Sequence, residues 1–112
     1  MSSIFNIKKG DTLPLLSVVL TDGAGDELDV SGADSVSFRM REMEAQQGVY
    51  KASGAADLVT DGTDGAVSFG FSAANTNEVG TFYGEFVIDW GSGDIQTVPN
   101  DDFLTIIVRE IA

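Results

Sequence analysis

Carboxylates are nearly the only side chains in this sequence that could carry out chemistry. The chain has 18 Asp and Glu residues and contains neither histidine nor cysteine. Without those two residue types there is no imidazole base, no Ser-His-Asp hydrolysis and no zinc site with His or Cys ligands. What remains is acid–base catalysis by two carboxylic acids, which requires a pocket that holds them close together. Nothing in the sequence marks such a pocket, so we expect no enzyme activity and no cofactor.

Many of the acidic residues lie in short runs beside glycine or other turn-forming residues. Loop carboxylates of this kind can bind calcium, although the spacing here does not match the EF-hand pattern. Gly-Asp turns also form without any ion. We therefore predict solvated turn carboxylates and no metal site, with calcium binding as the alternative. The runs are Asp22, Asp26, Glu27 and Asp29; Asp61 with Asp64; and Asp101 with Asp102.

The charge balance restricts the partners of the chain. Its formal net charge is -12, with only six basic residues. Binding to nucleic acid requires neutralisation of phosphates, so we expect neither nucleic acid nor an anionic membrane as a partner. Lys8 and Lys9 follow the first apolar residues, whereas a signal peptide has its charge before a longer apolar run. No apolar stretch is long enough to span a membrane. We expect a soluble protein made inside a cell.

Alternation of apolar and polar residues, interrupted by Gly and Asp turns, dominates the chain and predicts β-strands. Ala73–Val79 is predicted to be a short helical corner, and residues 42–47 a helical turn or a long loop. The clear strands are expected at Pro14–Thr21, Ser35–Met43, Ala66–Ser72, Thr81–Trp90 and Phe103–Ile111. Shorter strands are expected at Glu27–Val30, Val49–Lys51, Leu58–Thr60 and Ile95–Val98.

Seven to nine short strands at this spacing predict an all-β fold, an immunoglobulin-like antiparallel β-sandwich. Each sheet covers the apolar face of the other, so the alternating apolar residues form the core. We expect one domain over residues 1–112, in which residues 1–10 are a candidate extended N-terminal arm. The expected core includes Val36, Phe38 and Met40 on one strand and Phe82, Phe86 and Ile88 on another.

Several local motifs, taken in order, resemble one family. They are Gly10-Asp11-Thr12-Leu13-Pro14, Asp29-Val30-Ser31-Gly32-Ala33, Val36-Ser37-Phe38-Arg39-Met40-Arg41, Gly80-Thr81-Phe82-Tyr83-Gly84-Glu85-Phe86, Thr97-Val98-Pro99-Asn100, and Leu104-Thr105-Ile106 with Val108. This order resembles the immunoglobulin-like domain at the N-terminus of phage baseplate upper proteins and related small phage virion proteins. The resemblance covers the chain from about Lys8 onward, through motifs that are turns and core strands.

The resemblance implies a virion component that attaches one phage protein to another. Its partners would be other virion proteins, and its location the phage particle, after synthesis in the host cytoplasm. Within the particle we favour an adaptor of the tail or baseplate, with decoration of the capsid as the alternative. A homo-oligomer is compatible with either position. The alternative of another class is a carbohydrate- or receptor-binding module, because β-sandwiches also serve that function.

Two arginines and one aromatic residue are the first candidates for a contact surface. Arg39 and Arg41 are expected on the outer face of their strand, where acidic groups of a neighbouring subunit could meet them. The alternative is local pairing with Glu42 or Glu85, which contributes little to stability. Phe103, near the final hairpin, could anchor an interface or close the end of the core. For Trp90 we favour the core. For Tyr83 two alternatives stay open: the tyrosine corner of immunoglobulin-like sandwiches, in which the hydroxyl bonds a nearby backbone group, and an exposed contact position.

An apolar outer face on the last strand is the second candidate. If Leu104, Ile106 and Val108 point inward, Ile107 and Ile111 point outward, which is typical of an association surface. The apolar N-terminal residues could cover this face, either within the same subunit or by reaching a neighbour. These residues are Ile4, Phe5 and Ile7.

Overall fold

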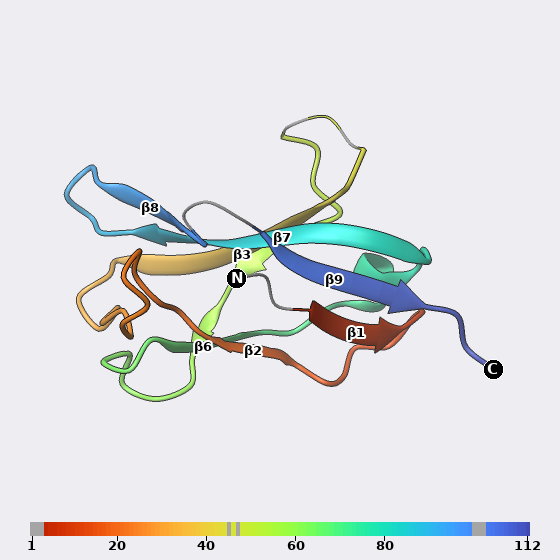
Figure 1. The fold of residues 1–112 in the computed structure, drawn as a ribbon, viewed down its shortest axis with the longest axis horizontal. Helices are drawn as coiled ribbons and strands as arrows, with labels where there is room; N and C mark the ends of the chain where they lie inside the picture. Colours follow the sequence, from red (N-terminus) through yellow and green to blue (C-terminus); the bar gives the residue numbers. More distant parts are fainter. Residues whose placement is uncertain (1–3, 45, 47, 100–102) are drawn as a thin grey trace.

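A computed structural model describes residues 4–44, 46, 48–99 and 103–112 (Figure 1). This part of the chain forms nine strands and one short 3-10 helix. The strands are β1 (Ile4–Lys8), β2 (Leu16–Val19), β3 (Ser35–Glu42), β4 (Ala52–Ala55), β5 (Asp57–Leu58), β6 (Ala66–Phe69), β7 (Gly80–Asp89), β8 (Ile95–Val98) and β9 (Leu104–Arg109). The helix η1 covers Ala73–Thr76, inside the helical corner expected there.

The strands form two sheets that face each other, with β3, β7 and β9 above and β2 and β6 below in Figure 1. The larger sheet has the order β1-β9-β7-β3-β4, and β8 also pairs with β7. β9 pairs with the first half of β7 and β8 with the second half. The smaller sheet has the order β2-β6-β5. The expected all-β sandwich is confirmed.

The strand order follows the immunoglobulin arrangement, in which strands A, B, E and D form one sheet and C, F and G the other. Here β2, β6 and β5 take the places of B, E and D, while β3, β7 and β9 take those of C, F and G. One pair departs from the antiparallel prediction, since β1 runs parallel to β9, with Ile4 opposite Thr105 and Lys8 opposite Arg109.

The core lies between the sheets and is rich in phenylalanine. Phe38 on β3 is fully buried and has its ring centroid 4.7 Å from that of Phe69 and 5.0 Å from that of Phe86. Phe71 meets the Phe38 ring edge-on at 6.0 Å. Aromatic side chains remove large apolar areas from water and gain further stabilisation in tilted and edge-to-face pairs. The alternating core residues expected on β3 and β7 are all buried.

Three short strands were placed wrongly from the sequence. Residues 27–30 make only an isolated bridge, between Thr21 and Glu27, because the N–H of Leu28 donates to Leu20 whereas the N–H of Val30 donates to the loop carbonyl of Gly62. The strand expected at Val49–Lys51 forms three residues later, as β4, where it pairs with β3. β5 ends at Leu58 instead of extending to Thr60. β3 ends at Glu42 and Met43–Glu44 form a turn, whereas Ala45 and Gln47 lie outside the described residues.

The N-terminal segment is part of the sandwich over residues 4–8. Parallel pairing with β9 turns Phe5 and Ile7 toward the core, where Phe5 stacks on Phe71 at 5.9 Å and Ile7 is 3% exposed. The prediction of an extended arm is therefore wrong for these five residues. Residues 1–3 lie outside the described part of the chain.

A glycine in the centre of β7 allows the core to close. A Cβ atom at Gly84 would lie 2.7 Å from Cδ1 of Ile106 and 2.8 Å from the ring of Phe38. Gly84→Ala should lower the free energy of unfolding by about 1–3 kcal/mol, because overpacking displaces rigid core side chains. Urea unfolding measures this change. Gly32→Ala is the control, since a Cβ atom there meets nothing within 4 Å; equal stability of the two variants would contradict the packing described.

Candidate interaction face

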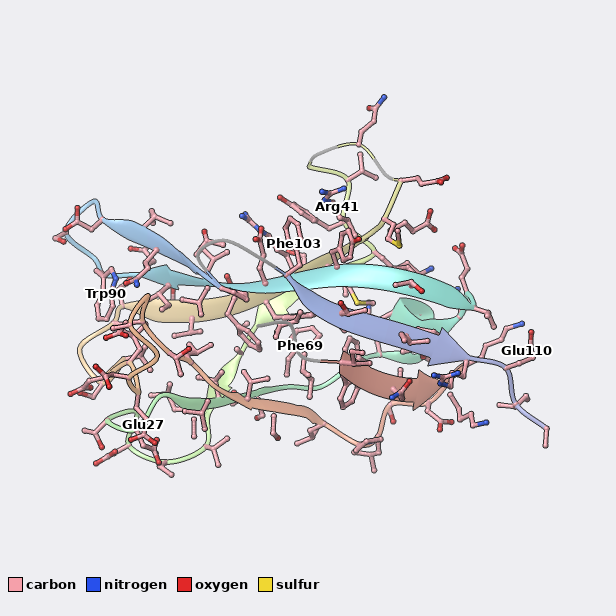
Figure 2. All side chains as sticks on the ribbon, in the orientation of Figure 1. Glu27, Arg41, Phe69, Trp90, Phe103 and Glu110 are labelled. Atoms are coloured by element: carbon pink, nitrogen blue, oxygen red, sulfur yellow. The ribbon has the colours of Figure 1, made fainter. Side chains whose placement is uncertain are left out.

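The outer face is the side of the larger sheet that points away from the smaller sheet. Its residues are set by the register of β3 with β7, in which Arg39 lies opposite Glu85 and Arg41 opposite Tyr83. Side chains alternate along a strand, so the same pairing that buries Phe38 and Phe86 turns these four outward. Figure 2 shows Arg41 on this side of the sheet, whereas Phe69 lies between the sheets.

Two aromatic rings stack on the outer face. The centroids of Tyr83 and Phe103 are 4.9 Å apart, and the rings are inclined by only 11°. Arg41 extends over Phe103, with its Cζ 5.8 Å from the ring centroid. Arg39 lies in the same way over Tyr50, with its Cζ 5.4 Å from the ring centroid. We call these five residues the aromatic–arginine cluster. Stacking and cation–π contacts fix the orientation of long side chains that would otherwise be free to rotate.

Arg39 also forms an ion pair with Glu85. Its Nη2 lies 2.8 Å from Oε1 of Glu85, and Nε donates a second hydrogen bond to the same oxygen. Both side chains are partly exposed, at 32% and 21%. Exposed pairs of this kind contribute about 0.2–1 kcal/mol, so the main effect is on geometry. The local pairing considered for Arg39 is the arrangement that the structure shows.

The apolar candidates separate into different surroundings. Ile107 is partly buried on the outer face, opposite Thr81 on one side and Asn6 on the other. Asn6 also accepts a hydrogen bond from Nε of Arg109. We considered that the apolar N-terminal residues could cover Ile107. They do not, because Phe5 and Ile7 point into the core. Ile7 is a core residue and no longer a candidate for the interface.

Two other apolar candidates are exposed at the ends of their strands. Ile4 is 64% exposed at the beginning of β1, and Ile111 is 59% exposed beyond the end of β9. The chain after β9 leads away from the sandwich (Figure 1). Neither residue belongs to the aromatic–arginine cluster. Trp90 packs against the core, as favoured, and its Nε1 donates to Oε1 of Gln96 at 3.3 Å.

The acidic loop residues make the turns that the sequence indicated. Oδ1 of Asp29 accepts hydrogen bonds from the hydroxyl and the backbone N–H of Ser31, and these bonds lower the pKa of Asp29. Thr63 donates to Asp61 in the same way and lowers the pKa of Asp61. Both carboxylates therefore stay charged while they hold their turns. Asp101 and Asp102 lie outside the described residues.

Within the described residues, no group of three or more acidic side chains is arranged to hold a metal ion. No helix in the same residues is long and apolar enough to cross a membrane. No protein-family model matches the sequence, and no curated protein is detectably similar to it.

Sequence reasoning missed one member of the cluster. Tyr50 was expected in a short strand at Val49–Lys51 but lies in the loop before β4, and only the fold brings it over Arg39. Tyr83 was placed correctly on the outer face, because Phe82 beside it is buried at 1% exposure. Its stacking on Phe103, the residue before β9, depends on the pairing of β9 with β7, which no local pattern reveals.

The stacked pair can be tested by a double-mutant cycle of Tyr83→Ala and Phe103→Ala. We expect a coupling energy of about 0.5–1.5 kcal/mol in the free energy of unfolding, because each substitution alone already removes the ring contact. Urea denaturation of the four proteins measures it. A cycle of Tyr83→Ala with Ile95→Ala, on β8 at the other end of β7, is the control and should be additive. Additivity in both cycles would contradict the stacking.

Asp64 offers a test of the turn carboxylates. The Thr60 hydroxyl and then the Ala66 N–H donate to this carboxylate and lower its pKa from the ordinary value of 3.8. When the pKa of a carboxyl is lower in the folded than in the unfolded protein, the charged carboxylate stabilises the fold at every pH above the unfolded pKa. This stabilisation is lost as the pH falls through the pKa of the folded state. Wild type should therefore exceed Asp64→Asn in stability near neutral pH and lose that advantage progressively as the pH falls below the ordinary carboxyl pKa of 3.8.

Thermal unfolding of both proteins between about pH 2 and about pH 7 measures this difference. When both proteins also carry Thr60→Val, the pH-dependent part of their stability difference should be smaller, because the strongest hydrogen bond to the Asp64 carboxylate is absent. A difference between wild type and Asp64→Asn that stays constant over the whole range would contradict the assignment.

Proposed function

We propose that this protein is a structural component of a phage particle and acts through protein–protein contacts made by its outer face. The observation that carries the contact surface is the aromatic–arginine cluster. Tyrosine, phenylalanine and arginine are enriched at interfaces, and the residues that dominate binding energy are mostly large side chains such as tyrosine and arginine. Here stacking, the ion pair with Glu85 and a rigid sheet hold them.

Charge indicates the chemistry of the partner surface. In a chain of net charge -12, two basic residues, Arg39 and Arg41, lie close together on the outer face. A guanidinium group donates several hydrogen bonds in a fixed plane and suits carboxylates. The partner should therefore present acidic or hydroxyl groups around a surface that accommodates the Tyr83–Phe103 pair.

The assignment to a phage particle is supported by the resemblance of the ordered motifs to phage baseplate and virion proteins. The immunoglobulin-like strand order agrees with the fold of those domains. An adaptor of the tail or baseplate is favoured, and decoration of the capsid is the alternative. Both roles use the same kind of surface, so the outer face supports them equally.

A carbohydrate-binding module is the candidate from another class, since three aromatic residues lie on one face. A sugar ring stacks on an aromatic face that is open to solvent. In this structure Tyr83 and Phe103 turn one ring face toward each other, and Arg41 and Arg39 lie over Phe103 and Tyr50. This arrangement favours a protein partner over a glycan. Binding on a glycan array that is lost in Tyr83→Ala would reverse this preference.

Incorporation into particles tests the proposal. Wild-type protein should be present in purified particles of the encoding phage at a fixed ratio to the major structural proteins, measured by quantitative mass spectrometry. Arg41→Ala and Tyr83→Ala should reduce its copy number at least about tenfold, equivalent to about 1.4 kcal/mol of contact energy. Asp57→Asn, on the smaller sheet, is the control and should be incorporated normally.

Circular dichroism and thermal unfolding of the isolated variants separate lost contact from lost folding. Both outer-face variants should unfold cooperatively and remain folded at the temperature of particle assembly. Absence of the wild-type protein from purified particles would contradict the phage assignment. Normal incorporation of both outer-face variants would contradict the assignment of the contact surface.

A further inference from the structure

In the described part of the chain, the strand β2 forms an open edge of the smaller sheet. β2 pairs with β6 on one side only, so it forms the edge of the sheet in the described part of the chain. The N–H of Leu20 donates to the carbonyl of Gly65, and the antiparallel register turns the backbone of Val18 toward β6 as well. Backbone groups alternate in direction along such a strand. Ser17 and Val19 therefore direct their N–H and C=O groups toward the free edge.

A groove lined by both apolar and polar groups lies along this free edge, between the two sheets, with a volume of about 690 Å³. The β2 side chains alternate, so that Leu16 and Leu20 are buried in the core while Val19 is 51% exposed. The larger sheet provides the opposite wall. The apolar residues that line the groove include Leu16, Val18 and Leu20 from β2 and Phe5, Val98 and Leu104 from the larger sheet.

β2 differs from the other edges in having no protective charge. Natural sheets prevent edge-to-edge pairing with charged residues, proline or very short edge strands. Among the described edges, β1 contains Lys8, β5 contains Asp57 and has two residues, β4 directly follows Lys51, and β8 directly follows Asp94. β2 contains only Leu, Ser and Val, between Leu15 and Leu20. Such an edge is suited to pairing with another strand.

The fold has a natural position for that strand. In immunoglobulin sandwiches, strand A pairs with strand B in the sheet that also holds E and D. The described residues provide B, E and D as β2, β6 and β5, while β1 pairs with β9 in the other sheet. A strand beside β2 would complete the sheet and cover the groove, which is the principle of donor-strand complementation.

Charge selects the kind of segment that fits. Asp22 is the only ionisable residue among the described groove-lining residues, and it lies three residues beyond the end of β2. A second copy of this chain would bring another net charge of -12 to the same edge. A segment with positive charge meets Asp22 favourably and avoids this repulsion.

We propose that the free edge of β2 binds an extended, basic segment of a different protein as an added strand. The segment alternates apolar residues, which enter the groove, with polar residues on the outside, and it carries Lys or Arg near Asp22. Residues 16–22 line the groove, so the segment spans about seven residues, or about 23 Å. This site is separate from the outer face and does not depend on the role proposed above.

The first test measures amide hydrogen exchange by NMR in the full chain alone. The amides of Ser17 and Val19 should exchange at least about tenfold faster than those of Val18 and Leu20, which face β6 and Gly65. Slow exchange at Ser17 and Val19 in the free protein would overturn the proposal, because it would show that the edge is already covered. Repeating the exchange measurement after dilution then identifies what covers the edge. A second copy of the chain dissociates on dilution and exchange becomes fast, whereas cover by the chain's own residues leaves exchange slow.

The second test uses a defined peptide of about seven residues in which Val and Thr alternate and Lys stands at both ends. Binding should slow exchange at Ser17 and Val19, whereas the same peptide with Glu at both ends should bind at least about tenfold more weakly. Val19→Pro removes an N–H that faces the free edge without removing a bond to β6. It should weaken binding of the Lys peptide at least about tenfold.

Val19→Thr is the matched control, since it keeps the N–H and a β-branched side chain, and it should bind the peptide like wild type. If Val19→Pro fails to fold, the exchange pattern of the wild-type protein with the two peptides still tests whether the free edge binds the basic segment. Absence of binding by the Lys peptide up to about 1 mM would overturn the proposal. Equal binding by the Glu peptide would overturn the basic character of the segment.

Discussion

The register between β3 and β7 is the constraint on which the rest of the structure depends. It pairs Ser35 with Asp89 at one end and Glu42 with Phe82 at the other. Within that span Phe38 and Phe86 point into the core, while Arg39 and Glu85 point outward and form their ion pair. A slip by one residue would exchange the two faces of a strand, burying arginines and exposing phenylalanines. Stability and the display of the outer face are therefore consequences of one pairing.

Much of this arrangement could be predicted from the sequence, because long alternating strands report directly which residues are buried. Val36, Phe38 and Met40, and likewise Phe82, Phe86 and Ile88, are buried as expected. The short elements were less predictable. Residues 27–30 have strand-like composition, but the N–H of Val30 donates to the loop carbonyl of Gly62, and only one bridge forms, at Glu27. β1 has apolar alternation without any local sign that its partner, β9, lies about a hundred residues away in sequence and runs parallel.

The two proposed contact surfaces were predictable to different degrees, for a physical reason. Arg39, Arg41 and Phe103 were candidates from their position on or beside alternating strands, whereas Tyr50 joins them only through the fold. The free edge of β2 is a property of the sheet as a whole, because periodicity shows the faces of a strand and not its neighbours. The outer face belongs to the larger sheet and the free edge to the smaller one. A domain with two such surfaces could contact two partners at once, as an adaptor in a particle requires.

A cryo-electron microscopy map of the purified phage particle tests the central claim most directly. The account predicts density for this sandwich at a defined position, with Arg41, Tyr83 and Phe103 against the surface of another virion protein and acidic groups of that protein near the two arginines. A particle map in which the sandwich is present with β3, β7 and β9 facing open solvent would contradict the assignment of the outer face. A particle without this density would contradict the structural role itself.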